Sequence, residues 1–223
     1  MIEIYEGSKE LFEKNKQRKI LLEDDGYVKS ILDDIEKRGD EALKEYTLKF
    51  DGVRIDDFLV IQDEIAEAYD NVDTELIQAL ETSADNIEDF HRRELPQSFL
   101  FEKKGITAGQ MILPLDSTGI YVPGGRATYP STVLMAAIPP KICGVPRIVV
   151  VTPPGKDGRC NDAVLVASDI AGVDEIYKVG GAQAIAALAY GTESIRKVSK
   201  IVGPGNRFVA MAKKLVETPT EFP

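Results

Sequence analysis

The sequence predicts an α/β protein in which an N-terminal helical region precedes a mostly parallel sheet with helices on both faces. From residue 116 onward, short apolar runs alternate with helical patterns, which is typical of strand–helix–strand units. Before residue 116, apolar residues recur at helical spacing instead. We therefore expect two regions, residues 1–115 and residues 116–223.

The first region is expected to contain four helices and a hairpin. One helical stripe follows Asp24-Asp25 and stops at Gly39, and a second opens at Asp40 and turns at Asp51-Gly52. An extended piece near residues 58–61 leads into helices near residues 64–69 and 74–93, and Lys103-Lys104-Gly105 is typical of a hairpin turn. The residues expected to face a core are Val28, Ile31, Leu32, Ile35, Ala42, Leu43, Tyr46, Phe50, Leu76, Ile77, Leu80, Ile87 and Phe90.

The second region is expected to form the sheet. Strands are predicted at residues 119–122, 148–151, 175–179 and 198–202. Helices are predicted at residues 131–142, 162–170, 182–189 and 206–216. The last residues, Glu217 to Pro223, have neither period nor cap and are expected to be a tail.

Charge and hydropathy exclude several classes of protein. The formal net charge is −10, from 27 basic and 37 acidic residues, which argues against a nucleic-acid partner. No apolar run approaches the roughly 20 residues that span a bilayer, and Met1-Ile2-Glu3-Ile4 lacks the pattern of a signal peptide. We therefore expect a cytoplasmic protein with no membrane partner.

Three glycine turns at predicted strand ends indicate a ligand crevice. They are Pro123-Gly124-Gly125, Gly180-Gly181-Ala182-Gln183 and Gly203-Pro204-Gly205-Asn206. Because strand-to-helix turns of an open α/β sheet collect at one edge, their backbone N–H groups can meet one anionic or polar ligand. A single such turn more often reflects backbone geometry, so the prediction depends on all three. The side chains they carry there are Tyr121, Arg126, Gln183 and Asn206.

A dinucleotide fits these turns without the standard glycine fingerprint. Residue Phe208 stands where the third glycine of G-x-G-x-x-G would be, so that fingerprint is not present. A dinucleotide still needs N–H donors, a cation, carboxamides and an aromatic wall, which the turns supply. Weak affinity is expected because helix-end effects contribute only ~0.3–1 kcal/mol each.

The residues offer no catalytic or metal-binding candidate. His91 is the single histidine and stands beside two arginines, which predicts an exposed imidazole without a catalytic role. Cys143 and Cys160 have no metal or redox spacing, and are expected to be core or surface thiols. The residue pattern alone therefore identifies no catalytic group.

Four blocks in order give the chain its resemblance to a known family. They are Arg38-Gly39-Asp40-Glu41-Ala42-Leu43 through Phe50-Asp51, the stretch Gly119 to Gly125, the stretch Val179 to Leu188, and Gly203-Pro204-Gly205-Asn206. In these blocks the chain closely resembles histidinol dehydrogenase, from about residue 25 to residue 216.

The resemblance implies a reaction and cofactors. Members oxidise L-histidinol to L-histidine in two NAD-dependent steps, and they are zinc-dependent homodimers. It implies NAD contacts for Tyr121, Gln183 and Asn206, in an incomplete Rossmann-like domain. Family chains are about twice as long, and their zinc ligands and catalytic Glu-His pair follow the last matching block. We therefore expect the cofactor-binding front half, inactive alone and homo-oligomeric through exposed apolar surface.

Two other hypotheses stay open. A non-catalytic nucleotide-binding or interaction module would explain the single histidine and the missing zinc ligands. An unrelated nucleotide-binding enzyme would fit the sheet but leaves the four family blocks unexplained.

Overall fold

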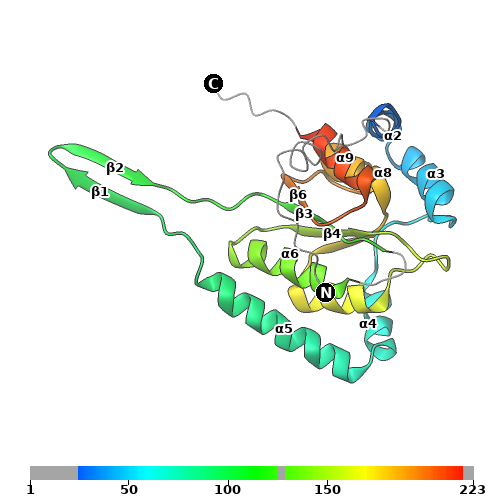
Figure 1. The fold of residues 1–223 in the computed structure, drawn as a ribbon, viewed down its shortest axis with the longest axis horizontal. Helices are drawn as coiled ribbons and strands as arrows, with labels where there is room; N and C mark the ends of the chain where they lie inside the picture. The colour runs from blue at the N-terminus through cyan, green and yellow to red at the C-terminus, as the bar shows by residue number, and fades with distance from the viewer. Residues whose placement is uncertain (1–24, 125–128, 218–223) are drawn as a thin grey trace, which may run out of the picture.

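A four-stranded parallel sheet forms the centre of the molecule (Figure 1). The computed structural model describes residues 25–124 and 129–217. The strands lie in the order β5-β4-β3-β6, and each neighbouring pair is parallel. They are β3 (Thr118–Tyr121), β4 (Ile148–Thr152), β5 (Glu175–Lys178) and β6 (Lys200–Val202). The predicted α/β class with a mostly parallel sheet is confirmed.

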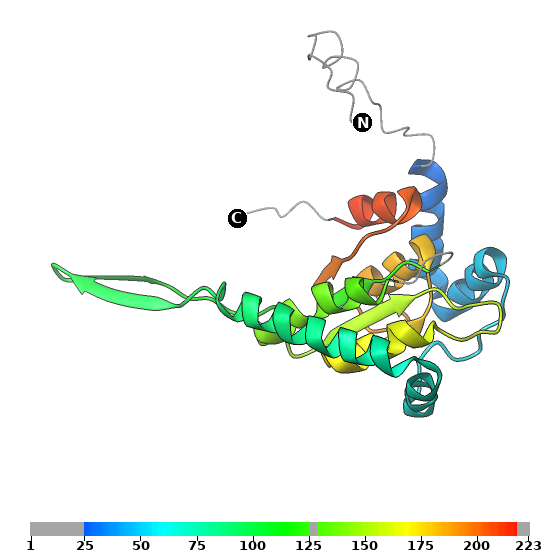
Figure 2. The ribbon, with the colours of Figure 1, turned by 60° about the horizontal axis from the view of Figure 1, so that its bottom comes forward.

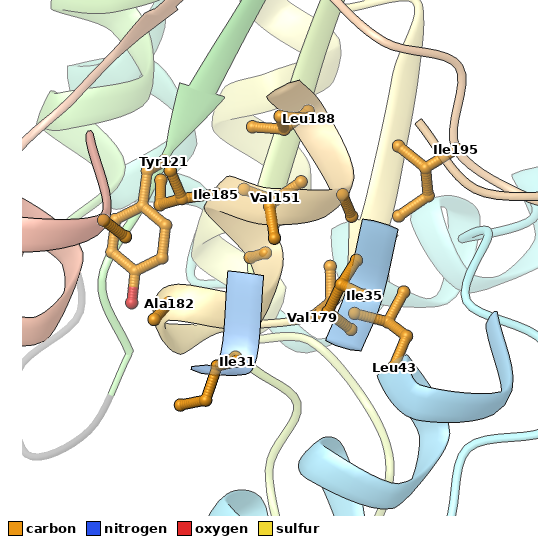
Figure 3. Packing of buried hydrophobic residues seen from close by; sticks show 14 of the residues in the cluster. Ile31, Ile35, Leu43, Tyr121, Val151, Val179, Ala182, Ile185, Leu188 and Ile195 are labelled. Atoms are coloured by element: carbon orange, nitrogen blue, oxygen red, sulfur yellow. The ribbon is translucent and has the colours of Figure 1, made fainter. Parts of the chain in front are cut away.

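Four helices cover one face of the sheet. α8 (Gly181–Tyr190) and α9 (Arg207–Val216) pack there with α2 (Asp25–Arg38) and α3 (Asp40–Asp51). The small side chains of α8 let it approach the sheet closely, since Ala182, Ala184, Ala186 and Ala187 are all buried. Figure 3 shows Ile31 and Ile35 of α2 in the same group of buried side chains as Val151 of β4, Val179 and the residues of α8.

Four further helices of the described residues cover the opposite face. α6 (Pro130–Ile142) and α7 (Asp162–Ala171) pack with α4 (Gln62–Asn71) and α5 (Thr74–Arg92). Within β4, Val149 and Val151 contribute to the core under α2 and α8, whereas Ile148 and Val150 contribute to the core under α6 and α7. The strand is therefore buried on both faces, as its uninterrupted apolar run requires.

The N-terminal helices share both cores with the sheet. The predicted extended piece near residues 58–61 runs beside β5: Leu59 forms an isolated antiparallel bridge with Tyr177, and Val60 donates to the carbonyl of Ile176. Phe58 is fully buried and belongs to the same core cluster as residues of α2 and α3. The division of the chain into two domains at residue 115 stays a prediction.

Three residues expected in the core are exposed. Phe50, Leu76 and Phe90 retain 44%, 38% and 59% of their accessible surface. Phe50 lies at the last turn of α3 and stacks on Tyr46, with 5.7 Å between the ring centroids. Phe90 lies near the end of α5, where that helix extends past the sheet (Figure 2). Helical periodicity alone did not show where each helix loses its packing partner.

A two-stranded hairpin projects away from the body of the molecule (Figures 1 and 2). It consists of β1 (Phe99–Lys103) and β2 (Ile106–Gln110), joined through Lys104 and Gly105 at φ 52° and 76°. Positive φ at both central residues is typical of tight hairpin turns. The predicted hairpin is confirmed, and every residue of both strands is exposed.

Self-association through the hairpin region is expected because apolar side chains stand in solvent there. Leu100 and Met111 are 77% and 78% exposed. Light scattering should give a mass above that of one chain, and replacing both residues with serine should lower it. A wild-type chain that is monomeric at every concentration tested would contradict this expectation.

Candidate functional site

The predicted crevice lies at the carboxyl edge of the sheet, where β3 and β6 are neighbours. From β3 the chain moves outward through β4 to β5, and then returns through α8 to place β6 on the other side of β3. Such a reversal of strand order opens a crevice beyond the strand ends, and ligands of open α/β sheets bind there. The turns after β3 and β6 flank this switch point.

A cavity of about 960 Å³ lies at this edge. It reaches from α2 and α3, across the ends of β3 and β4, to the first turns of α8 and α9. Its size suits a ligand of several rings, since small-molecule sites span roughly 300–1,000 Å³. The three residues predicted to contact a cofactor, Tyr121, Gln183 and Asn206, all line it.

Tyr121 brings a buried phenol to the cavity. The residue is only 4% exposed, and its hydroxyl oxygen accepts a hydrogen bond of 3.2 Å from the backbone N–H of Gly181. Figure 3 shows the hydroxyl beside Ala182, at the start of α8. Burial raises the pKa of Tyr121, the Gly181 hydrogen bond lowers it and the charge of Asp51 raises it, with a net upward shift. The phenol therefore stays protonated and keeps its O–H as a donor.

Gln183 is the polar exception in a helix of small apolar residues. It lies in the first turn of α8 and is 1% exposed, among the least accessible polar side chains described. Its Oε1 is buried and has no hydrogen-bond partner among the described residues. A buried amide oxygen without a partner costs about 1–3 kcal/mol. Close packing does not explain a glutamine here, and a hydrogen-bonding ligand would give this oxygen a partner.

Asn206 has a structural role that the sequence argument did not assign. It is the N-cap of α9, and its Oδ1 accepts hydrogen bonds from the backbone N–H groups of Phe208 (3.0 Å) and Val209 (3.1 Å). Asparagine before a helix is a common cap, so this signal was present in the sequence. The cap uses the oxygen, which leaves the amide N–H groups as the part that can donate to a ligand.

The cavity also contains residues that the sequence argument missed. Phe50 and Asp51 enter it from the end of α3, and Tyr27 from α2. The loop after β4 adds Lys156 and Arg159. Lys156 and Arg159 follow a predicted strand and so reach this edge by topology, whereas the residues of α2 and α3 reach it only through the packing of those helices on α8. Gly125 and Arg126 lie outside the described residues.

The remaining candidates lie away from the cavity. The His91 imidazole is 25% exposed rather than open to solvent, because Nδ1 lies 2.7 Å from a carboxylate oxygen of Glu94 at the end of α5. Cys143 is an exposed free thiol and Cys160 a buried one, and burial raises the pKa of Cys160 to about 12. Within residues 25–124 and 129–217, no three His, Cys, Asp or Glu side chains converge as metal ligands.

Comparison with known proteins decides the family. Residues 14–222 match the profile of histidinol dehydrogenase. The chain belongs to the histidinol dehydrogenase family. It is 54% identical over 201 residues to the histidinol dehydrogenase of Methanothermobacter thermautotrophicus, which covers 89% of this chain and 47% of that protein. It is 52% identical over 190 residues to that of Bacillus subtilis, covering 85% and 44%.

A solved structure of the histidinol dehydrogenase family has the same fold. The crystal structure of histidinol dehydrogenase from Elizabethkingia anophelis superimposes with a TM-score of 0.86 at 38% identity, and the match covers 94% of this chain and 49% of that one. The chain thus spans about half the length of the relatives it matches. In the described part of the chain, no helix has the length and hydropathy to cross a membrane.

Proposed function

We propose that this chain forms the NAD-binding half of a histidinol dehydrogenase, which oxidises L-histidinol to L-histidine in two NAD-dependent steps. One observation carries the proposal. Tyr121, Gln183 and Asn206 come from three separate turns, yet they line one cavity at the switch point of the sheet. Family members at 52% and 54% identity support the reaction.

The described residues fit NAD in their hydrogen-bonding chemistry. The Tyr121 hydroxyl and the Asn206 amide offer donors, and the buried Oε1 of Gln183 offers an acceptor that has no partner among the described residues. NAD would accept the hydride from the substrate carbon. These three side chains would hold and orient the cofactor.

The described residues do not fit zinc. Zinc sites need three or four converging His, Cys, Asp or Glu ligands, and no such group occurs in the described part of the chain. We therefore assign no step of the reaction to a metal held by these residues. A homodimer, as the resemblance implies, belongs to the same proposal.

An NAD titration tests the cofactor site. Calorimetry should show weak NAD binding by the wild-type chain, and Gln183→Ala should weaken it about tenfold because a buried hydrogen-bond partner is lost. Asn206→Ser should weaken it as well, since serine still caps α9 but has no amide donor. Tyr121→Phe removes only the hydroxyl.

The matched control for Gln183→Ala is Gln110→Ala, in the exposed hairpin. It should leave NAD affinity unchanged. If Gln183→Ala and Asn206→Ser also leave it unchanged, the proposed cavity is wrong. Mixing the chain with L-histidinol, NAD and zinc should give no NADH, and turnover abolished by Gln183→Ala would instead show a complete catalytic site in these residues.

A further inference from the structure

Asp51 is an acidic residue of the cavity to which the proposed function gives no role. It is the last residue of α3, it lines the cavity, and its Oδ2 is buried without a hydrogen-bond partner among the described residues. It also forms no ion pair in the described part of the chain. A carboxylate normally accepts several hydrogen bonds, so the folded protein leaves this oxygen unsatisfied.

The position of Asp51 is unfavourable for a negative charge. The end of α3 carries the negative pole of the helix, and a carboxylate there is destabilising. The nearest basic residue in the helix, Lys49, lies over the aromatic rings of Tyr27, Tyr46 and Phe50, at 5.4–5.9 Å from their centroids. Burial raises the pKa of Asp51 to about 6, so the group is still ionised at pH 7.5. No contact with the described residues explains why an acid stands here.

The other two acids of the cavity differ from Asp51. Asp157 is exposed, and its Oδ1 accepts a hydrogen bond of 3.1 Å from the backbone N–H of Arg159, which shapes the loop. Asp162 lies in the first turn of α7, where the helix dipole favours a carboxylate. The local structure therefore explains the acidic residue at both of these positions, whereas no contact with the described residues explains the one at position 51.

Dinucleotide-binding sheets commonly place an acid at the ribose. In that arrangement a carboxylate in the unit formed by the first two strands accepts a hydrogen bond from a ribose hydroxyl. The corresponding second strand is β4, which ends at Thr152 and is followed by Pro153 and Pro154, with no acid. The charge of Asp51 acts on the Tyr121 hydroxyl at the end of the adjacent strand β3, so α3 brings a carboxylate to the same edge.

We propose that Asp51 accepts a hydrogen bond from a ribose hydroxyl of the dinucleotide bound in this cavity. The inference rests on the proposed function. Rotation about the last side-chain bond exchanges the two carboxylate oxygens, so either can meet the hydroxyl. The carboxylate thus selects for a ribose, and the cost of burying it is offset only in the complex.

Calorimetric titration with NAD at pH 7.5 tests this with Asp51→Asn. The variant should bind NAD roughly tenfold more weakly, because a hydrogen bond to a charged acceptor is replaced by one to a neutral acceptor. Loss of a negative charge alone would strengthen binding of an anionic ligand, so weaker binding reports the lost hydrogen bond. Asp56→Asn makes the same chemical change at an exposed position outside the cavity and should leave affinity within twofold.

A thermal melt without ligand separates a binding role from a structural one. Asp51→Asn should raise the melting temperature, since it removes a charge without a partner, while lowering affinity. A variant that melts earlier and also loses NAD would overturn the proposal, because the loss then reflects damage to the fold.

Titrations with AMP and with nicotinamide mononucleotide locate the hydroxyl. The Asp51→Asn loss should occur with one of these halves of NAD, and equal losses with both would contradict a single hydroxyl contact. If wild type binds NAD and Asp51→Asn binds equally well, the inference fails and the proposed function stands. If wild type binds no NAD, both fail.

Discussion

Gly203→Ala is expected to lower the free energy of unfolding by about 3 kcal/mol or more and to weaken NAD binding. Gly203 follows β6 with φ 112°, which alanine rarely adopts. A Cβ atom there would lie 2.1 Å from the backbone carbonyl oxygen of Tyr121. Because that contact is to backbone, the strands must separate, and Tyr121 moves with them. Urea unfolding measures the first effect and calorimetric titration the second.

Gly144→Ala separates conformational strain from the clash. Gly144 has φ 80°, and an added Cβ would meet nothing within 4 Å. Gly144→Ala should therefore lower the free energy of unfolding by only about 1 kcal/mol and leave NAD affinity unchanged. Gly203→Ala could instead lower the free energy of unfolding by no more than Gly144→Ala does. The close approach of residue 203 to Tyr121 would then not be the reason for a glycine at this position.

Arg147→Ala is expected to lower the free energy of unfolding by about 3 kcal/mol. The guanidinium forms two hydrogen bonds to Glu175 at 2.8 and 2.7 Å, and it also donates to the carbonyl oxygens of Arg196 and Lys197. It thereby joins β5 to the segment that leads into β6. The side chains of Arg147 and Glu175 are 12% and 20% exposed, so removal of Arg147 leaves a largely buried carboxylate that keeps only its hydrogen bonds from Arg196 and Tyr177 among those described.

Acid should weaken the same pair. The Arg147 hydrogen bonds, which outweigh the opposing effect of burial and are helped by those from Arg196 and Tyr177, lower the pKa of Glu175 to about 2, well below the value of 4.5 for an unperturbed glutamate. The unfolded chain binds the proton first, so the contribution of Glu175 to stability is complete above about pH 4.5 and is lost as the pH falls toward 2. In Glu175→Gln, stability measured by urea unfolding should fall less between pH 5 and pH 3 than in wild type.

The exposed pair Arg54–Asp56 gives the comparison. Its side chains are 80% and 76% exposed, and Arg54→Ala should change the free energy of unfolding by less than about 0.5 kcal/mol. An equal loss in Arg147→Ala and Arg54→Ala would mean that burial adds nothing to the Arg147–Glu175 pair.

Local patterns predicted the sheet because its strands are short apolar runs that can be recognised in the sequence. β4 is the run Ile148–Thr152, buried on both faces, and Asn161 and Gly172 mark the two ends of α7 as a cap and a left-handed terminus. These signals depend on neighbours in sequence. Phe50 and Phe90 were assigned wrongly to the core. Burial depends on which element packs against a helix, and an apolar stripe does not show which part of the helix is covered.

The candidate site was predicted in part for the same reason. The three turns sit at strand ends, so topology alone brings Tyr121, Gln183 and Asn206 to one edge. Asp51 comes from a helix some 70 residues before Tyr121, and it reaches the cavity through the packing of α3 on α8. The sequence likewise could not show that an oxygen of Asp51 and of Gln183 lacks a hydrogen-bond partner, since that depends on the three-dimensional structure.

Because the hairpin projects from the molecule, its local stability differs from the global stability of the sheet and helices. Figures 1 and 2 show no other helix or strand of the described residues packed on β1 and β2, so their ladder can open while the sheet and its helices stay closed. Deuterium should therefore enter the amides of residues 99–110 through local opening, at a rate independent of global unfolding. Those amides then become a built-in reporter: anything that covers the hairpin slows their exchange, whereas a ligand held at the sheet edge slows only the amides of the body.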